Sequence, residues 1–179
     1  ILMSSRMLLD KGIQEYCMAA ERVNRNLDNK VKFKLSGPID QPSPTSISKS
    51  ELEKMVLKYG VEYLGDRADM PELLASATLF VLPSYYSEGL PKVLLEASAC
   101  GVPIITTDHP GCRDAIINKE TGLLVSIKDP ESLSNAIIEL LSNNSLSKHM
   151  GKKARLLAKK SFQVSSVVDA HYSVYKQLL

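Results

Sequence analysis

The chain has 179 residues, a length that fits one domain with a full-sized hydrophobic core. Apolar residues make up 44% and charged residues 23%, values that are ordinary for a globular protein and argue against disorder. The net charge of +2 does not indicate nucleic-acid binding, and no apolar run approaches the ~20 residues of a membrane-spanning helix. Three cysteines (Cys17, Cys100, Cys112) form no CxxC pair, and the histidines share no metal-ligand spacing. We expect reduced thiols, no metal and a cytoplasmic location.

Short apolar runs alternate with longer helical stretches along the chain. We expect strands at 1–5, 31–35, 61–65, 78–83, 102–107 and 122–125. We expect helices at 10–27, 48–59, 69–77, 91–100, 129–143, 146–160 and 164–178, with a turn and short helix at 110–117. The segment 38–50 is rich in proline and serine and predicts a surface loop.

Several helix ends have recognisable signals. Asp10 is expected to cap the first long helix. Ser48 and Glu51 have the spacing of a capping box, and Gly60 is expected to end the helix that they open. Asp129, followed by a proline, is expected to cap a later helix.

Strands that alternate with helices predict parallel βαβ units. About six strands in this length predict an α/β fold with a Rossmann-like, doubly wound parallel sheet and helices on both faces. In such sheets ligands bind beyond the carboxyl ends of the strands, at the switch point of the strand order. Function is therefore expected in the loops that follow the runs 1–5 and 78–83.

The stretch SEGLPKVLLEASACG, at 87–101, follows a strand that is almost wholly apolar. We expect Pro91 at the first helical position and Leu90 as the N-cap residue. Leucine has no oxygen with which to cap a helix, so N–H groups of Leu90, Lys92 and Val93 are predicted to face solvent or an anion. Gly89 would let a ligand approach the backbone closely.

Two glutamates flank this helix start. Glu88 precedes the helix, and Glu96 lies five residues after Pro91, or roughly 7.5 Å along the axis. Carboxylates on either side of an anion site suit a nucleotide diphosphate sugar, whose diphosphate separates two hydroxyl-bearing sugars. The alternative is a pair of solvated glutamates near a helix start, where acidic residues are favoured anyway.

Arg6 and Lys11 follow the first apolar run and are expected at the same carboxyl edge of the sheet. Arginine binds phosphate with two parallel hydrogen bonds, while lysine acts as a point charge. Two ordinary surface cations are the alternative interpretation.

Four segments in this order, SRMLLDKG, VEYLG, LFVLPSYYSEGLPKVLLEASACGVPIITTD and ETGLLV, resemble the C-terminal, donor-binding domain of GT-B glycosyltransferases of the retaining GT4 type. The resemblance covers nearly the whole chain, and the Glu-x7-Glu pattern formed by Glu88 and Glu96 carries most of it. It implies transfer of a sugar from a nucleotide sugar, with UDP the expected nucleotide, with retention of configuration and without metal or cofactor. "PGCRD" is similar to enzymes of bacterial surface polysaccharide or lipid-linked glycan synthesis.

The resemblance also implies roles for residues. Arg6 and Lys11 would bind the diphosphate, Glu88 the transferred sugar and Glu96 the ribose. The backbone at 89–93, namely Gly89, Leu90, Lys92 and Val93, would meet sugar and phosphates, and the loop that holds Arg67 would seat the base. Catalysis would rest on Glu88, Arg6 and Lys11. The family often has glycine where Pro91 stands. It usually has glutamate where Asp114 stands, so no role is assigned to Asp114.

A GT-B enzyme also has an N-terminal domain that binds the acceptor, and the chain has room for one such domain only. Residues 1–179 are therefore expected to be the donor-binding C-terminal domain, with the acceptor domain absent and with weak turnover. The last helix resembles the segment that crosses back to that domain. The basic stretch GKKARLLAKK, at 151–160, suggests contact with anionic lipid at the inner membrane face, with a solvated helix face as the alternative.

Three other functions fit parts of the pattern. The first alternative is a noncatalytic nucleotide-sugar-binding module that regulates or scaffolds a partner chain. A glycosidase that uses Glu88 and Glu96 is disfavoured, because both carboxylates would have to face one bond. A dinucleotide-dependent dehydrogenase is disfavoured too, since no GxGxxG follows the first strand.

Overall fold

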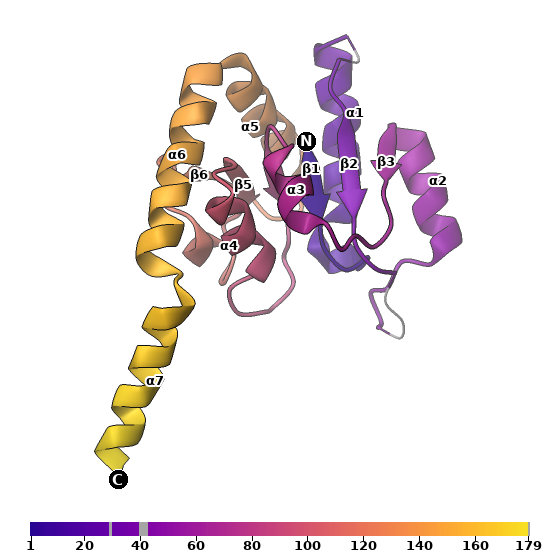
Figure 1. Cartoon of the computed structure of the whole chain (residues 1–179). Coiled ribbons are helices and arrows are strands. Elements are labelled where there is room, and N and C mark those ends of the chain that lie inside the picture. Colours follow the sequence, from indigo (N-terminus) through magenta and orange to yellow (C-terminus); the bar gives the residue numbers. More distant parts are fainter. Residues whose placement is uncertain (29, 40–42, 179) are drawn as a thin grey trace.

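The computed structural model describes residues 1–28, 30–39 and 43–178 (Figure 1). Six parallel strands form one sheet in the order β3-β2-β1-β4-β5-β6. They are β1 (Leu2–Ser4), β2 (Phe33–Ser36), β3 (Val61–Tyr63), β4 (Phe80–Leu82), β5 (Ile104–Thr107) and β6 (Gly122–Val125). The strand order reverses direction between β1 and β4, and the predicted doubly wound sheet is confirmed.

Helices cover both faces of the sheet (Figure 1). They are α1 (Ile13–Asn26), α2 (Lys49–Tyr59), α3 (Met70–Ala75), α4 (Lys92–Ala99), α5 (Pro130–Ser142), α6 (Asn144–Ser161) and α7 (Val164–Leu178), with short 3-10 turns η1 (Leu9–Lys11) and η2 (Arg113–Ala115). α1 packs against α2 and α5, while α4 packs against α3 and α6. β4 and β5 are buried at every position, as their apolar sequences predict.

Most of the predicted helix ends are confirmed. Ser48 and Glu51 form both hydrogen bonds of the capping box, and Gly60 ends α2 in the left-handed conformation. The Asp129 side chain accepts hydrogen bonds from the first turn of α5. β2 begins two residues later than expected because its ladder with β1 pairs Lys34 with Leu2. In the predicted loop 38–50, residues 40–42 lie outside the described part.

The prediction that Asp10 caps the first long helix is wrong. Asp10 lies inside η1, and Gly12 in the left-handed conformation (φ 79°) is the N-cap of α1. The reason is a close approach, because a Cβ atom at position 12 would lie 2.2 Å from the carbonyl oxygen of Pro83. Only glycine lets the loop after β1 turn against the end of β4 in this way.

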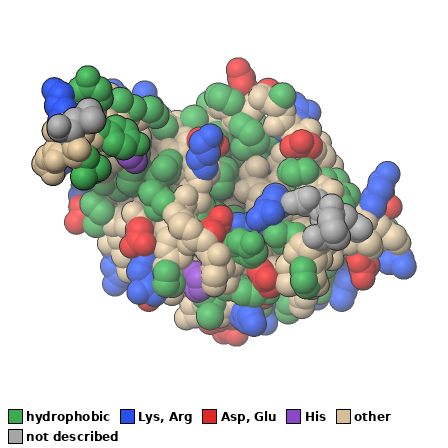
Figure 2. Space-filling model, turned by 90° about the horizontal axis from the view of Figure 1, so that it is seen from below, with side chains coloured by type: hydrophobic (Ala, Val, Ile, Leu, Met, Phe, Trp, Pro, Cys, Tyr) green, Lys and Arg blue, Asp and Glu red, His purple; other side chains and the backbone are tan. Residues whose placement is uncertain are grey.

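The last helix, α7, projects from the body of the protein (Figure 1). None of its described residues is buried, and its apolar side chains are exposed, among them Val164, Val167, Val168, Tyr172, Val174, Tyr175 and Leu178. They gather on the projecting segment at the upper left of Figure 2. The helix therefore presents an exposed apolar side. No helix among the described residues is long and apolar enough to cross a membrane.

Candidate functional site

The loops that follow β1 and β4 lie at the switch point and are held together by hydrogen bonds. The Tyr85 N–H donates to the carbonyl of Asp10 at 2.9 Å, and the Ser84 hydroxyl donates to the same carbonyl at 3.4 Å. Ser84 is fully buried, so these bonds form in a setting where unpaired polar groups are costly. The two segments that carry the predicted cations and Glu88 are thus brought to one place. Figure 2 looks onto this edge of the sheet from below.

Lys11 and Glu88 form an ion pair between these loops. The Lys11 side chain is only 7% exposed and that of Glu88 27% exposed. A buried ammonium group needs an anionic or polar partner, and the Glu88 carboxylate meets that need here. The two residues stand 77 positions apart in the chain, and the structure brings them together as the predicted site requires.

A tyrosine ring joins the two predicted cations. The Lys11 ammonium nitrogen lies 4.6 Å from the ring centroid of Tyr86, and the guanidinium carbon of Arg6 lies 5.6 Å from the same centroid. Both distances are within the range of cation–π attraction. The aromatic residue was not among the predicted site residues. Its position, two residues before Glu88, was the only signal in the sequence.

The helix start at α4 has no side-chain cap, as predicted, but its register differs by one residue. Pro91 is the N-cap, with extended backbone (φ −63°, ψ 118°), and the helix begins at Lys92. The expectation that Leu90 caps the helix is therefore wrong. Pro91 lies ahead of the first turn, so the N–H groups of Lys92 and Val93 are both present there. Leu94 N–H bonds to the Pro91 carbonyl at 3.0 Å, whereas those of Lys92 and Val93 have no partner among the described residues.

A third loop supports the segment between Glu88 and the helix. Gly111 has φ +82°, and a Cβ atom there would lie 2.4 Å from the Gly89 carbonyl oxygen and 2.7 Å from that of Glu88. The Gly111 N–H donates to the Asp114 carboxylate at 3.1 Å, which fixes the turn. Sequence reasoning missed this contact, since it depends on two loops that meet only in the folded chain. The glycine in the "HPGC" turn was the available signal.

Buried polar side chains on β5 hold the end of β4. The Thr107 hydroxyl donates to the Ser84 carbonyl, and the Thr106 hydroxyl donates to that of Leu82 at 2.7 Å. The Cys112 thiol lies 3.9 Å from the Ser84 carbonyl, and burial raises its pKa. These contacts keep the loop that leads to Glu88 in place.

In the described part of the chain, neither Glu96 nor Arg67 contacts the Lys11–Glu88 ion pair. Glu96 is exposed on α4 and lines a cavity of about 300 Å³ with Met70, Pro71, Leu74, Ala99, Cys100 and Arg155. Arg67 lies in the loop after β3 and makes two hydrogen bonds to Asp69, at 2.8 and 2.6 Å. These bonds raise the pKa of Arg67 and lower that of Asp69. The roles predicted for Glu96 and Arg67 stay predictions.

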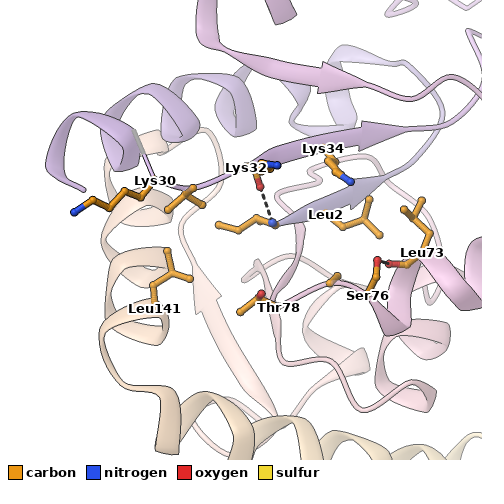
Figure 3. Close-up of a pocket in the computed structure, with 11 residues that line it drawn as sticks. Leu2, Lys30, Lys32, Lys34, Leu73, Ser76, Thr78 and Leu141 are labelled. Carbon is orange, nitrogen blue, oxygen red and sulfur yellow. Dashed lines mark hydrogen bonds between the residues drawn. The ribbon is translucent and has the colours of Figure 1, made fainter. Parts of the chain in front are cut away.

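A further cavity lies at the opposite edge of the sheet (Figure 3). Its volume is about 340 Å³, and residues at the beginnings of β1 and β2, including Leu2, Lys32 and Lys34, line it together with Leu73 and Leu141. None of the predicted site residues contributes to it. Since ligands of doubly wound sheets bind at the carboxyl edge, we assign no role to this cavity.

A doubly wound sheet with two cations and an open helix start at its switch point is an arrangement that suits an anionic ligand. The family model described as glycosyl transferases group 1 matches residues 1–157. The chain belongs to this family.

Known proteins of similar sequence and structure agree with this family assignment. An N,N'-diacetylbacillosaminyl-diphospho-undecaprenol alpha-1,3-N-acetylgalactosaminyltransferase of Campylobacter jejuni is 38% identical over 155 residues, which are 86% of this chain and 38% of that protein. The structure of HepE of Anabaena, solved in complex with UDP, superposes on this chain with a TM-score of 0.87 and 21% sequence identity. The superposition covers 98% of this chain and 48% of the HepE chain. The chain thus spans less than half the length of these two proteins. Its fold is that of one half of a GT-B glycosyltransferase.

A domain of this kind has also been crystallised by itself. The C-terminal domain of a group 1 glycosyl transferase (LpcC) from Francisella tularensis superposes over 91% of this chain and 86% of its own, with a TM-score of 0.77 and 22% identity. This fold therefore exists as an isolated unit, and experiments on the present chain alone are reasonable.

Proposed function

We propose that this chain is the donor-binding half of a glycosyltransferase that moves a sugar from a UDP-sugar to an acceptor, with retention of anomeric configuration. The observation that carries the proposal is the Lys11–Glu88 ion pair beside the uncapped start of α4, at the switch point of the sheet. HepE, which shares the fold, was solved with UDP.

The diphosphate would meet Arg6, Lys11 and the first N–H groups of α4. When the bond between the anomeric carbon and the diphosphate oxygen breaks, negative charge collects on the leaving diphosphate. Fixed cations and the helix dipole stabilise that charge without a metal ion. The partner of the Lys11 ammonium in the free protein is the Glu88 carboxylate. An arriving phosphate takes over part of this pairing, which frees Glu88 to accept hydrogen bonds from the sugar hydroxyls.

The remaining predicted contacts complete the donor site. Glu96 accepts hydrogen bonds from the ribose, and the loop that holds Arg67 borders the base. The acceptor and a second, N-terminal domain complete the active site from the opposite side of the cleft, so the isolated chain binds donor but turns over poorly. The acceptor is a lipid-linked glycan, in line with the substrate in the name of the Campylobacter relative.

Titration calorimetry of the chain with UDP, GDP and ADP, each with Mg²⁺ and with EDTA, tests the donor role. We expect UDP to bind equally in both buffers and more tightly than the other two. Lys11→Met should weaken UDP binding by more than tenfold, because it removes a charged hydrogen-bond donor from the diphosphate. Failure of all three nucleotides to bind would refute the proposal.

We place the protein in the cytoplasm, in peripheral contact with an anionic membrane. Residues 141–168 hold six Lys or Arg and no Asp or Glu, although the whole chain has a net charge of only +2. Lys153 pairs with Glu120 and Arg155 bonds to a backbone carbonyl, while Lys152 and Lys159 are exposed on α6. Each such cation contributes about 1 kcal/mol near an anionic leaflet.

Co-sedimentation with vesicles tests the membrane contact. We expect binding to vesicles with 30% phosphatidylserine, roughly the anionic surface for which such attraction is known, and none to pure phosphatidylcholine. The double variant Lys152→Glu/Lys159→Glu should release the protein. Lys54→Glu on α2 is the matched control and should not. Equal sedimentation of both variants would contradict the assignment.

A further inference from the structure

Tyr86 has a position that no catalytic role explains. Its ring is the one contact that Lys11 and Arg6 share among the described interactions, at 4.6 and 5.6 Å from the ring centroid. Two cations that share one ring repel each other; the Glu88 carboxylate offsets this for Lys11, and a further attraction toward the ring acts on both cations. The negative face of an aromatic ring supplies that attraction.

From this geometry we infer that Tyr86 is a positioning residue that holds Lys11 and Arg6 ready for the donor diphosphate before the donor arrives. The inference rests on the proposed function. Long cationic side chains lose rotamer freedom when they bind a phosphate, and that loss weakens binding. Side chains that already lie against a ring lose less. The ring therefore contributes to affinity without touching the donor.

The backbone around Tyr86 is held independently of its ring. The Tyr86 N–H donates to the Ser84 hydroxyl at 3.2 Å, and the Tyr85 N–H donates to the Asp10 carbonyl at 2.9 Å. Removal of the ring should therefore leave the loop and Glu88 in place. The effect of losing the ring can therefore be distinguished from the effect of unfolding the loop.

The neighbouring tyrosine provides a matched control. The Tyr85 ring contacts a different cation, Lys128, whose ammonium nitrogen lies 4.7 Å from its centroid. Tyr85 and Tyr86 are both partly buried in the same loop, so their substitution perturbs the fold to a similar degree. Of these two tyrosines, only Tyr86 lies against the predicted diphosphate cations.

UDP titration of Tyr86→Leu, Tyr86→Phe and Tyr85→Leu tests the inference. We expect Tyr86→Leu to weaken UDP binding about threefold to tenfold, the range that a cation–π contact supports. Tyr86→Phe keeps the ring and should bind like the wild type, and so should Tyr85→Leu. Equal affinities for Tyr86→Leu and Tyr85→Leu, or tighter binding by Tyr86→Leu, would overturn the inference while the donor role stands.

A second readout needs no ligand. Protons on the Lys11 side chain, which lies against the Tyr86 ring, should resonate upfield in the free wild-type protein and in Tyr86→Phe. This ring-current shift should be lost in Tyr86→Leu and retained in Tyr85→Leu. An unchanged Lys11 spectrum in Tyr86→Leu would show that the ring does not hold the ammonium group. If the wild type binds no UDP, both the donor role and this inference fail.

Discussion

Substitution of Gly111 tests whether its loop supports the candidate site, because its effect on UDP binding can be compared with its effect on the stability of the fold. A Cβ atom at position 111 would lie 2.4 Å from the Gly89 carbonyl oxygen, whereas real Cβ contacts essentially never fall below 3.0 Å. The two backbone segments at Gly111 and Gly89 must therefore move apart by about 0.6 Å (3.0 − 2.4) in Gly111→Ala. Because the backbone at Gly89 is proposed to meet the diphosphate, a hydrogen bond to that charged group is lost or weakened, and we expect UDP affinity to fall about tenfold.

Gly60 is the matched control, because it has a similar positive φ (67°, against 82° at Gly111) and no atom within 4 Å of an added Cβ. An alanine at either position costs about 1–2 kcal/mol of stability in the left-handed conformation. Thermal melting should show a loss for both variants, larger for Gly111→Ala because its clash adds to the conformational cost. Calorimetry should show weaker UDP binding for Gly111→Ala alone. Wild-type UDP affinity in Gly111→Ala would refute the argument that this loop positions the Gly89 backbone for the diphosphate.

Three further results are expected. Glu96→Ala should weaken UDP binding about tenfold in calorimetry, through loss of charged hydrogen bonds to the ribose, and unchanged affinity would remove Glu96 from the site. Burial raises the pKa of Glu15, one of whose oxygens lacks a partner among the described residues. The native state thus favours the protonated form of the Glu15 carboxyl. The contribution of Glu15 to the stability of the fold falls as the pH rises from the ordinary pKa of 4.5 through the raised value. Glu15→Gln should therefore raise the melting temperature at pH 7 relative to wild type, with a smaller difference near pH 4; no gain at pH 7 would contradict this. A thiol reagent should modify exposed Cys100 first, because Cys17 is buried with a pKa raised to about 12; equal rates would contradict the burial.

The sheet was predictable because its central strands are buried on both faces. β4 is wholly apolar, and β5 combines two isoleucines with two β-branched threonines, so both segments favour a buried strand over a helix. The capping box at Ser48 and Glu51 was predictable for a related reason, since both partners lie within one turn of the chain. Local signals of this kind need no knowledge of the tertiary structure.

Contacts between distant loops could not be predicted in the same way. The turn at Gly12 depends on Pro83, and the Gly111 turn depends on Gly89. Pro91 was expected inside the helix because proline favours the first position, but its extended backbone places it one residue earlier. The N–H groups of Lys92 and Val93 therefore form the start of the helix, and proline occupies neither position.

The most direct test of the account is where UDP binds. In a 15N-labelled sample of this 19.7 kDa chain, UDP should shift the amide resonances of Gly89, Lys92 and Val93 at the switch point, with smaller changes elsewhere. Because Lys11→Met is expected to weaken UDP binding by more than tenfold, it should strongly reduce these shifts at a UDP concentration that half-saturates the wild type. Shifts confined to Lys32 and Lys34 at the opposite edge, or no shifts at all, would contradict it.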